Sequence, residues 1–182
     1  MTAFVNLVTP IASPHPGVRS GAATYYTSPM ILPNVTAAAA AANTAYYQPF
    51  CLPGQLIDRI GIETTVGGGN ARMGLYTNLN GVPDQLIIDG GVLDVSGVAI
   101  NEISLTALYL PNAWFWTCIV YSGTPTVRIG STANSYYTGV ANLTTTYRGF
   151  SATLAYGALP AQASMSGFVI VTQAGTTMVR KS

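Results

Sequence analysis

The chain has 182 residues, a length that suits one domain of ordinary size. Its residues are 49% hydrophobic and 7% charged, against roughly 25% charged in typical soluble domains. So few charges predict that partner subunits cover much of the exterior. The formal net charge of +1 gives no basic footprint for phosphates, so we expect no nucleic-acid partner.

The start of the chain has no basic segment followed by an apolar run, and no apolar stretch reaches the ~18 residues that a membrane span needs. We therefore expect neither a secreted nor a membrane protein. Cys51 and Cys118 lie in apolar runs, where a free buried thiol is the commoner state. The sequence leaves their pairing open.

Residues 1–43 predict an extended N-terminal arm, because five prolines interrupt them and no helical or strand period is sustained. The alanines at 37–42 favour helix but suffice for at most one turn. The arm is too apolar for a typical disordered tail, so we expect a protein surface to hold it. Its candidate assembly residues are Phe4, Val5, Leu7, Val8, Tyr25, Tyr26, Met30, Ile31 and Leu32.

From residue 44, short aromatic and β-branched runs alternate with Gly, Pro and Asn about every ten residues, which is typical of a sandwich or barrel. Apolar and polar residues alternate over 56–63 and 72–76, around a turn at Gly67-Gly68-Gly69-Asn70. The next elements are a turn at Asn80-Gly81, short runs on both sides of Gly90-Gly91, and a strand over 102–110.

Residues 112–121 are apolar on both sides, which predicts a strand covered on both faces. One face should fill the core, and the other should lie under the arm, a loop or a neighbouring subunit. Short strands near 126–129 and 168–172 complete the pattern. The prediction for residues 44–182 is an all-β, jelly-roll-like antiparallel β-sandwich.

Residues 131–166 are small, polar and rich in tyrosine, and they predict a long excursion with one hairpin. Exposed tyrosines present an apolar ring with a polar rim and can stack on sugars, although a core or interface role is the commoner one. The candidate surface or glycan contacts are Tyr136, Tyr137 and Tyr147.

The sequence contains few of the side chains that known catalytic and metal sites use. His15, the one histidine, lies between prolines, so a histidine metal cluster or a Ser-His-Asp site lacks its base. Asp89 with Asp94, or Asp58 with Glu63, could form a glycosidase-like pair, but such residues more often cap turns or solvate an outer face. We predict no catalytic, cofactor-binding or metal-binding residue.

Several segments resemble a β-sandwich module of tailed-bacteriophage virion proteins. They are Ala45-Tyr-Tyr-Gln-Pro-Phe-Cys-Leu-Pro, Ile57-Asp-Arg-Ile-Gly-Ile-Glu-Thr-Thr, Ala71-Arg-Met-Gly-Leu-Tyr-Thr-Asn, Gly81-Val-Pro-Asp-Gln-Leu-Ile-Ile-Asp-Gly-Gly and Leu110-Pro-Asn-Ala-Trp-Phe-Trp. The likeness covers residues 46–129 and leaves out the arm and the tail beyond Gly130.

The resemblance implies a non-enzymatic virion protein, made in the host cytoplasm and placed on the outer surface of the particle. Because no fibre shaft accompanies the domain, we expect a capsid decoration or cement protein, bound by its arm to the major capsid protein and to its own copies as a homotrimer. The alternative is a receptor-binding tail fibre or spike component that binds host glycan.

Overall fold

The computed structural model describes residues 25–27, 35–130, 149–164, 166–171, 175 and 177–181. These residues form ten β-strands, and every ladder between them is antiparallel. The predicted all-β, antiparallel sandwich class is confirmed. Within this part of the chain, no helix has the length and apolarity to cross a membrane.

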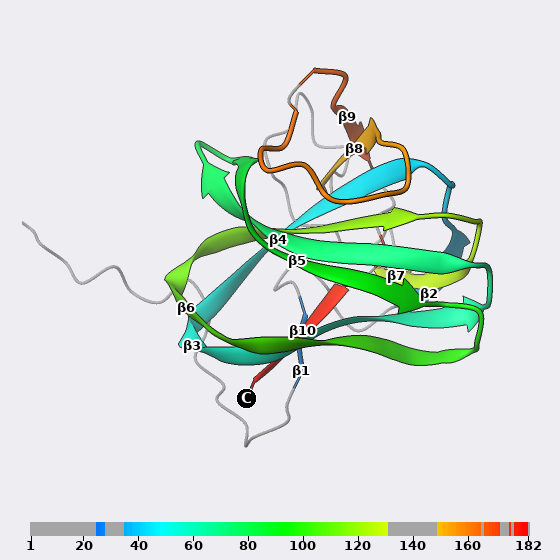
Figure 1. Ribbon diagram of the computed structural model, residues 1–182, viewed down its shortest axis with the longest axis horizontal. Helices are drawn as coiled ribbons and strands as arrows, with labels where there is room; N and C mark the ends of the chain where they lie inside the picture. Colours follow the sequence, from blue (N-terminus) through cyan, green and yellow to red (C-terminus); the bar gives the residue numbers. More distant parts are fainter. Residues whose placement is uncertain are drawn as a thin grey trace, which may run out of the picture.

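The strands are β1 (Tyr25–Thr27), β2 (Val35–Ala39), β3 (Thr44–Val66), β4 (Asn70–Leu79), β5 (Val82–Asp94), β6 (Ala99–Tyr121), β7 (Thr126–Gly130), β8 (Gly149–Thr153), β9 (Val169–Val171) and β10 (Thr177–Lys181) (Figure 1).

A long ribbon of β3 and β6 organises the fold, with pairing from Ala45–Val120 to Thr64–Ala99. The sequence predicted two strands on either side of Pro111, but β6 runs through this residue. Proline has no N–H to donate, and the ladder tolerates it here because it stands opposite Gly54, whose φ of +70° marks an irregular position.

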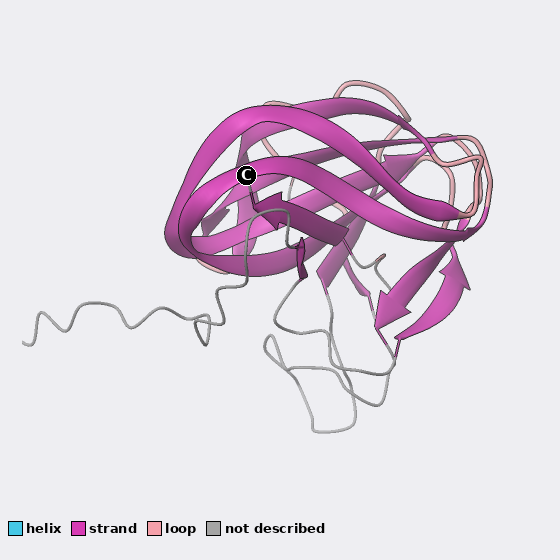
Figure 2. Cartoon of the chain, turned by 90° about the horizontal axis from the view of Figure 1, so that it is seen from below, coloured by secondary structure: helices cyan, strands magenta, loops and turns pink. Residues whose placement is uncertain are grey.

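The ribbon is shared by two half-sheets. In the first half-sheet, β8 pairs with residues 44–47 of β3 and β9 lies beyond β8, while β4 and β5 lie beyond the last part of β6. In the second, β10 and β1 lie beside residues 57–62 of β3. Between them the register shifts, so that Asp58 faces three residues of β6. Such bulges bend strands, and the sheet curls round its core in Figure 2.

The main core lies between the two half-sheets. Ile60 and Ile62 of β3 meet Met73 of β4 and Ile119 of β6, while β10 contributes Val179. All five side chains are buried. Their burial on one face of each strand explains the alternation that the sequence shows, because successive side chains point to opposite faces.

Two turns agree with the prediction. β3 and β4 are joined through Gly67-Gly68-Gly69, and β4 and β5 through Asn80-Gly81, whose φ angles of 52° and 86° fit a two-residue hairpin turn. Gly90-Gly91 differs, because β5 continues through it. Gly91 has a φ of 94°, and the register shifts beside it between Met73 and Gly74, so these glycines form a bulge.

The described part of the predicted arm range belongs to the sheet. Tyr25–Thr27 pairs with β10, and Val35–Ala39 pairs with β7, which also contacts the end of β3. Strand pairing therefore replaces the expected helical turn in the alanine run, since tertiary contacts override a weak local propensity. The rest of the arm range, residues 1–24 and 28–34, lies outside the described residues.

Candidate ligand-binding groove

The last part of β6 is buried on both faces, as its sequence predicts. Phe115 and Ile119 belong to the main core, whereas Trp116 and Cys118 belong to a second cluster on the outer face of the first half-sheet. A loop covers this outer face of β6. It forms part of a covering segment, which we define as residues 149–164 and 166–171, and which crosses the top of the molecule in Figure 1.

The covering segment packs closely on the sheet. Leu159 approaches Gly74 of β4 so closely that a Cβ at Gly74 would lie 2.5 Å from the Leu159 Cδ1 atom and 2.6 Å from the Ile88 carbonyl oxygen. Asn43 holds the part of the segment that follows β8: its carbonyl oxygen accepts a hydrogen bond from Leu154 N at 3.0 Å, and its Oδ1 accepts one from Tyr156 N at 2.9 Å. β8 pairs with β9, which lies where the sequence predicted a short strand near 168–172. The hairpin predicted within 131–166 falls largely on residues 131–148, which lie outside the described residues.

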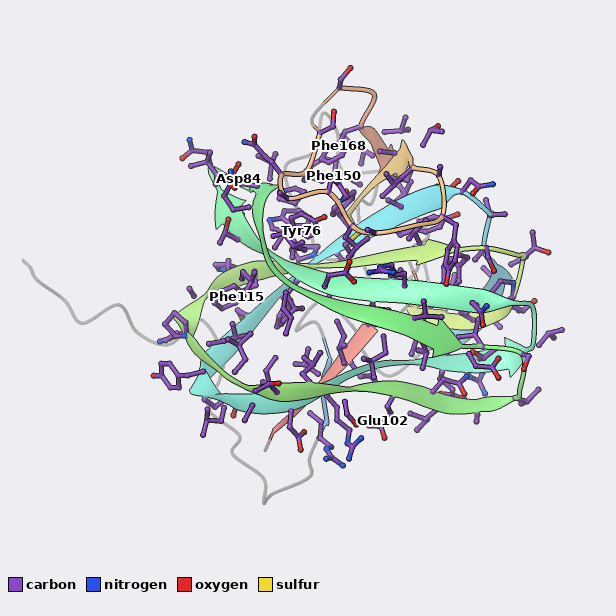
Figure 3. All side chains as sticks on the ribbon, in the orientation of Figure 1. Tyr76, Asp84, Glu102, Phe115, Phe150 and Phe168 are labelled. Atoms are coloured by element: carbon purple, nitrogen blue, oxygen red, sulfur yellow. The ribbon has the colours of Figure 1, made fainter. Side chains whose placement is uncertain are left out.

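Aromatic rings fill the contact between the covering segment and β6. Phe150 of β8 packs against Trp116 with a centroid distance of 5.3 Å, and it stacks on Phe168 at 5.4 Å and an interplanar angle of 19°. Phe150 and Phe168 lie close together above Tyr76 in Figure 3. The Tyr76 hydroxyl donates to the Pro160 carbonyl at 2.8 Å and so ties β4 to the same segment.

A groove opens where this cover ends. Its volume is about 320 Å³, and its lining residues are Pro49, Asn78, Gly81, Trp114, Trp116 and Phe150. Trp114, two residues before Trp116, lies on the same face of β6 but beyond the cover, so 40% of its surface is exposed against 3% for Trp116. The groove is therefore an uncovered end of the second core.

Asn78 orients one wall of the groove. Its Oδ1 accepts a hydrogen bond of 2.9 Å from the Trp116 Nε1 atom, and its Nδ2 amino group has no partner among the described residues. Trp116 is thus held both by Asn78 and by Phe150. None of the six lining residues carries a charge. These groups can hold a neutral ligand against an aromatic surface and donate one hydrogen bond to it.

The carboxylates that could have formed an acid pair have separate structural partners. The Arg72 Nε–H is shared between both carboxylate oxygens of Asp89, each 2.9 Å from Nε, and Asp89 also accepts a bond of 3.0 Å from Leu159 N. Asp94 accepts a bond of 2.8 Å from Ser96 N. Hydrogen bonding to Ser96, first by its side chain and then by its backbone N–H, lowers the pKa of Asp94. These two residues therefore cap a bulge and a turn.

Asp58 and Glu63, the other possible acid pair, also have separate structural partners. Asp58 binds Arg180, with Nε–Oδ1 and Nη2–Oδ2 distances of 3.0 and 2.6 Å, and Glu63 binds Arg128 at 3.0 Å. Asp84 accepts a bond of 2.9 Å from Gln162 Nε2 in the covering segment. Each carboxylate thus joins two strands or a strand and a loop.

Both cysteines are free and buried, which agrees with the expectation of buried thiols. Burial raises the pKa of the Cys118 thiol to about 12 and that of Cys51 to about 11. A nucleophilic cysteine needs a lowered pKa, so neither thiol has the environment of a reactive group. Within the described residues, no group of three His, Cys, Asp or Glu side chains could hold a metal ion.

Most of the predicted site residues lie outside the described residues. They are Phe4, Val5, Leu7, Val8, Met30, Ile31 and Leu32 of the arm range, and Tyr136, Tyr137 and Tyr147 of the excursion. His15 also lies outside them. For Tyr25 and Tyr26, the structure describes the backbone, which pairs with Arg180 and Val179 of β10.

Sequence reasoning did not identify the groove. It predicted that residues 112–121 form a strand covered on both faces, but it could not tell where the cover of the outer face would end. The proximity of Asn78 follows from the pairing of β4 with β6, in which Thr77 stands opposite Phe115. A signal was nevertheless present, since both tryptophans of the chain lie on this face.

No protein-family model and no curated protein matches the chain. Among solved structures, the chain is similar to part of a structure of the cysteine protease and lectin-like domains of Cwp84, a surface-layer-associated protein of Clostridium difficile. The sequence identity is 15% and the TM-score 0.49, over 77% of this chain and 33% of that one. The chain spans about a third of the length of that structure.

Proposed function

We propose that this chain is a non-enzymatic structural protein of a tailed-bacteriophage virion and decorates or cements the outer surface of the capsid. Its partners are the major capsid protein and further copies of itself, as a homotrimer. The observation that carries the proposal is the set of large apolar side chains that the sandwich leaves exposed. The resemblance of residues 46–129 to a virion module supports the same placement.

The exposed apolar residues suit an assembled state. Leu56 and Tyr109 oppose each other in the β3–β6 register, and 47% and 60% of their surfaces are exposed. Directly opposed residues share one face of a sheet, so the two form one apolar surface. Further exposed apolar side chains are Val66, Leu79, Val92, Val98, Ile100, Val169 and Ile170. Apolar patches on a weakly charged surface mark contacts with other proteins.

The positions of the acids support a structural role rather than hydrolysis. Glycoside hydrolysis needs two carboxyl groups that face one bond of the substrate. Asp58 and Glu63 instead bind Arg180 and Arg128, and Asp89 binds Arg72.

Loss of the protein from virions tests the capsid role. Particles that lack it should lose genomes or heads on heating, while their adsorption to cells is retained. The location of a labelled protein on the particle gives an independent readout. Heat-stable particles with impaired adsorption would contradict a cement function.

Deletion of residues 1–24 tests the anchoring role of the arm. This deletion removes Phe4, Val5, Leu7 and Val8 but leaves β1 and β2, whereas a deletion through residue 43 would also remove two strands of the sheet. The shortened protein should keep its β circular dichroism spectrum and fail to join particles. Normal incorporation into particles would overturn the anchor.

A second candidate is a receptor-binding tail component that recognises a host-surface glycan. The groove favours it, because its exposed indole and uncharged lining suit a sugar. In this case, particles without the protein should resist heat and fail to adsorb, and the label should appear at the tail.

A further inference from the structure

We propose that the groove between β4, β6 and β8 binds a neutral sugar ring, with the ring stacked on Trp114. The inference rests on the second candidate function and names the binding site and the chemical class of its ligand. It also moves glycan recognition from Tyr136, Tyr137 and Tyr147 to a different part of the chain.

The dimensions of the groove suit a small ligand. A volume of about 320 Å³ lies at the lower end of the range of roughly 300–1,000 Å³ that is typical of small-molecule sites. Trp114 lines the groove, and 40% of its surface is exposed, so this side chain is accessible to a ligand there. One or two sugar rings fit such a space better than a folded partner does.

The chemistry of the lining selects a neutral ring with one apolar face. A pyranose has an apolar face of axial C–H groups and a rim of hydroxyl groups. An aromatic side chain can bury the C–H face while the hydroxyl groups keep their polar contacts. Asn78 Nδ2 is a donor without a partner among the described residues and can meet one hydroxyl. Because none of the described lining residues is charged, they offer nothing to compensate a carboxylate or a phosphate.

The Trp116 wall of the groove is pre-organised in the absence of a ligand. Trp116 is fixed by its hydrogen bond to Asn78 and by contact with Phe150, which in turn stacks on Phe168. The tight Asn80-Gly81 turn limits the movement of the β4–β5 end beside it. A pre-formed wall lowers the entropy that binding must overcome.

Tryptophan fluorescence gives a direct readout, because the chain contains two tryptophans and both line the groove. The full chain is titrated with neutral trisaccharides of glucose, galactose and mannose up to about 10 mM, the range of weak binding. The acidic trisaccharide sialyllactose serves as the comparison. We expect a saturable change in emission with at least one neutral sugar and a weaker effect of sialyllactose.

Two variants place the binding in the groove. Trp114→Ala should weaken binding at least about tenfold in calorimetric titration, because it removes the exposed stacking surface. Thr106→Ala is the control, since Thr106 is an exposed residue of the same strand outside the groove, and the affinity of this variant should equal that of the parent. Unchanged melting temperatures would show that both variants fold.

Three results would overturn the inference: no saturable change with any neutral sugar, equal binding by Trp114→Ala, or a preference for sialyllactose. The virion proposal has a separate readout in the location of the labelled protein on particles. A protein present on virions that binds no sugar refutes the groove alone, and a sugar-binding protein absent from virions refutes the virion role alone.

Discussion

Buried tyrosines in this protein differ in what their hydroxyl groups contact. Tyr76 donates to the Pro160 carbonyl, whereas the hydroxyl of Tyr121 is buried without a hydrogen-bond partner among the described residues. Burial, followed by the influence of Tyr46, holds the pKa of Tyr121 well above its ordinary value. An unpaired buried hydroxyl costs free energy, while a paired one contributes to stability.

Tyr121→Phe should therefore leave the free energy of unfolding unchanged or raise it. Tyr76→Phe, the matched change, should lower it by about 1 kcal/mol, because it removes a hydrogen bond to the covering segment. Urea denaturation of both variants measures the difference. A larger loss for Tyr121→Phe than for Tyr76→Phe would show that the Tyr121 hydroxyl makes a stabilising contact.

The Asp58–Arg180 pair gives the protein an acid-sensitive contact between β3 and β10. Hydrogen bonding to Arg180, the largest cause, lowers the pKa of Asp58 below its ordinary 3.8. A lowered folded pKa means that the contribution to stability is present above about pH 4 and is lost as the pH falls through the folded value.

Asp58→Asn should lower stability at neutral pH and reduce the decline of stability as the pH falls below about 4. Denaturation curves at several pH values provide the measurement. Glu63→Gln breaks the more exposed pair with Arg128 and should cost less than about 1 kcal/mol at neutral pH. An identical acid decline in Asp58→Asn and in the parent would exclude this contact as a source of acid sensitivity.

At the scale of elements, the contact between β4 and the covering segment depends on a glycine. A Cβ at Gly74 meets Leu159 and the Ile88 backbone at distances under 3.0 Å, whereas one at Gly97 meets nothing within 4 Å. Position 74 requires a glycine because the covering segment, through Leu159, and β5, through the Ile88 backbone, both approach it closely.

Gly74→Ala should destabilise the protein by about 1–3 kcal/mol, since the backbone of β5 and the loop must shift. Gly97→Ala should be neutral or slightly stabilising, because it only restricts the unfolded chain. Thermal unfolding of the two variants compares them. Equal melting temperatures would mean that the cover adjusts without cost.

Strand prediction from the sequence succeeded where the signal is local. Alternation over residues 56–63 and the Asn80-Gly81 turn depend on neighbouring residues, and both are present in the structure. It failed at Pro111, at Gly90-Gly91 and in the alanine run. In those places a partner strand decides the conformation: β3 stands opposite Pro111, β4 opposite the bulge, and β7 beside β2.

At the scale of the whole molecule, the exposed pair of Leu56 and Tyr109 makes a prediction about assembly. Replacing both by lysine should reduce the assembled mass in sedimentation velocity, because the apolar surface is lost and like charges meet. Thr106→Lys is the control, since it adds a charge at an exposed polar position of the same strand. Unchanged assembly of the double variant would place the contact elsewhere.

The sequence by itself determined the all-β class, most of the turns and the double burial of residues 112–121, because these depend on side-chain period and on turn chemistry. Only the tertiary structure decided that a loop covers the outer face of β6 and that the cover ends between Trp116 and Trp114. Contacts such as that of Tyr156 N with Asn43 Oδ1 join residues 113 positions apart, and no local pattern encodes such a pairing. The groove exists for this reason, at the boundary between a covered and an uncovered tryptophan.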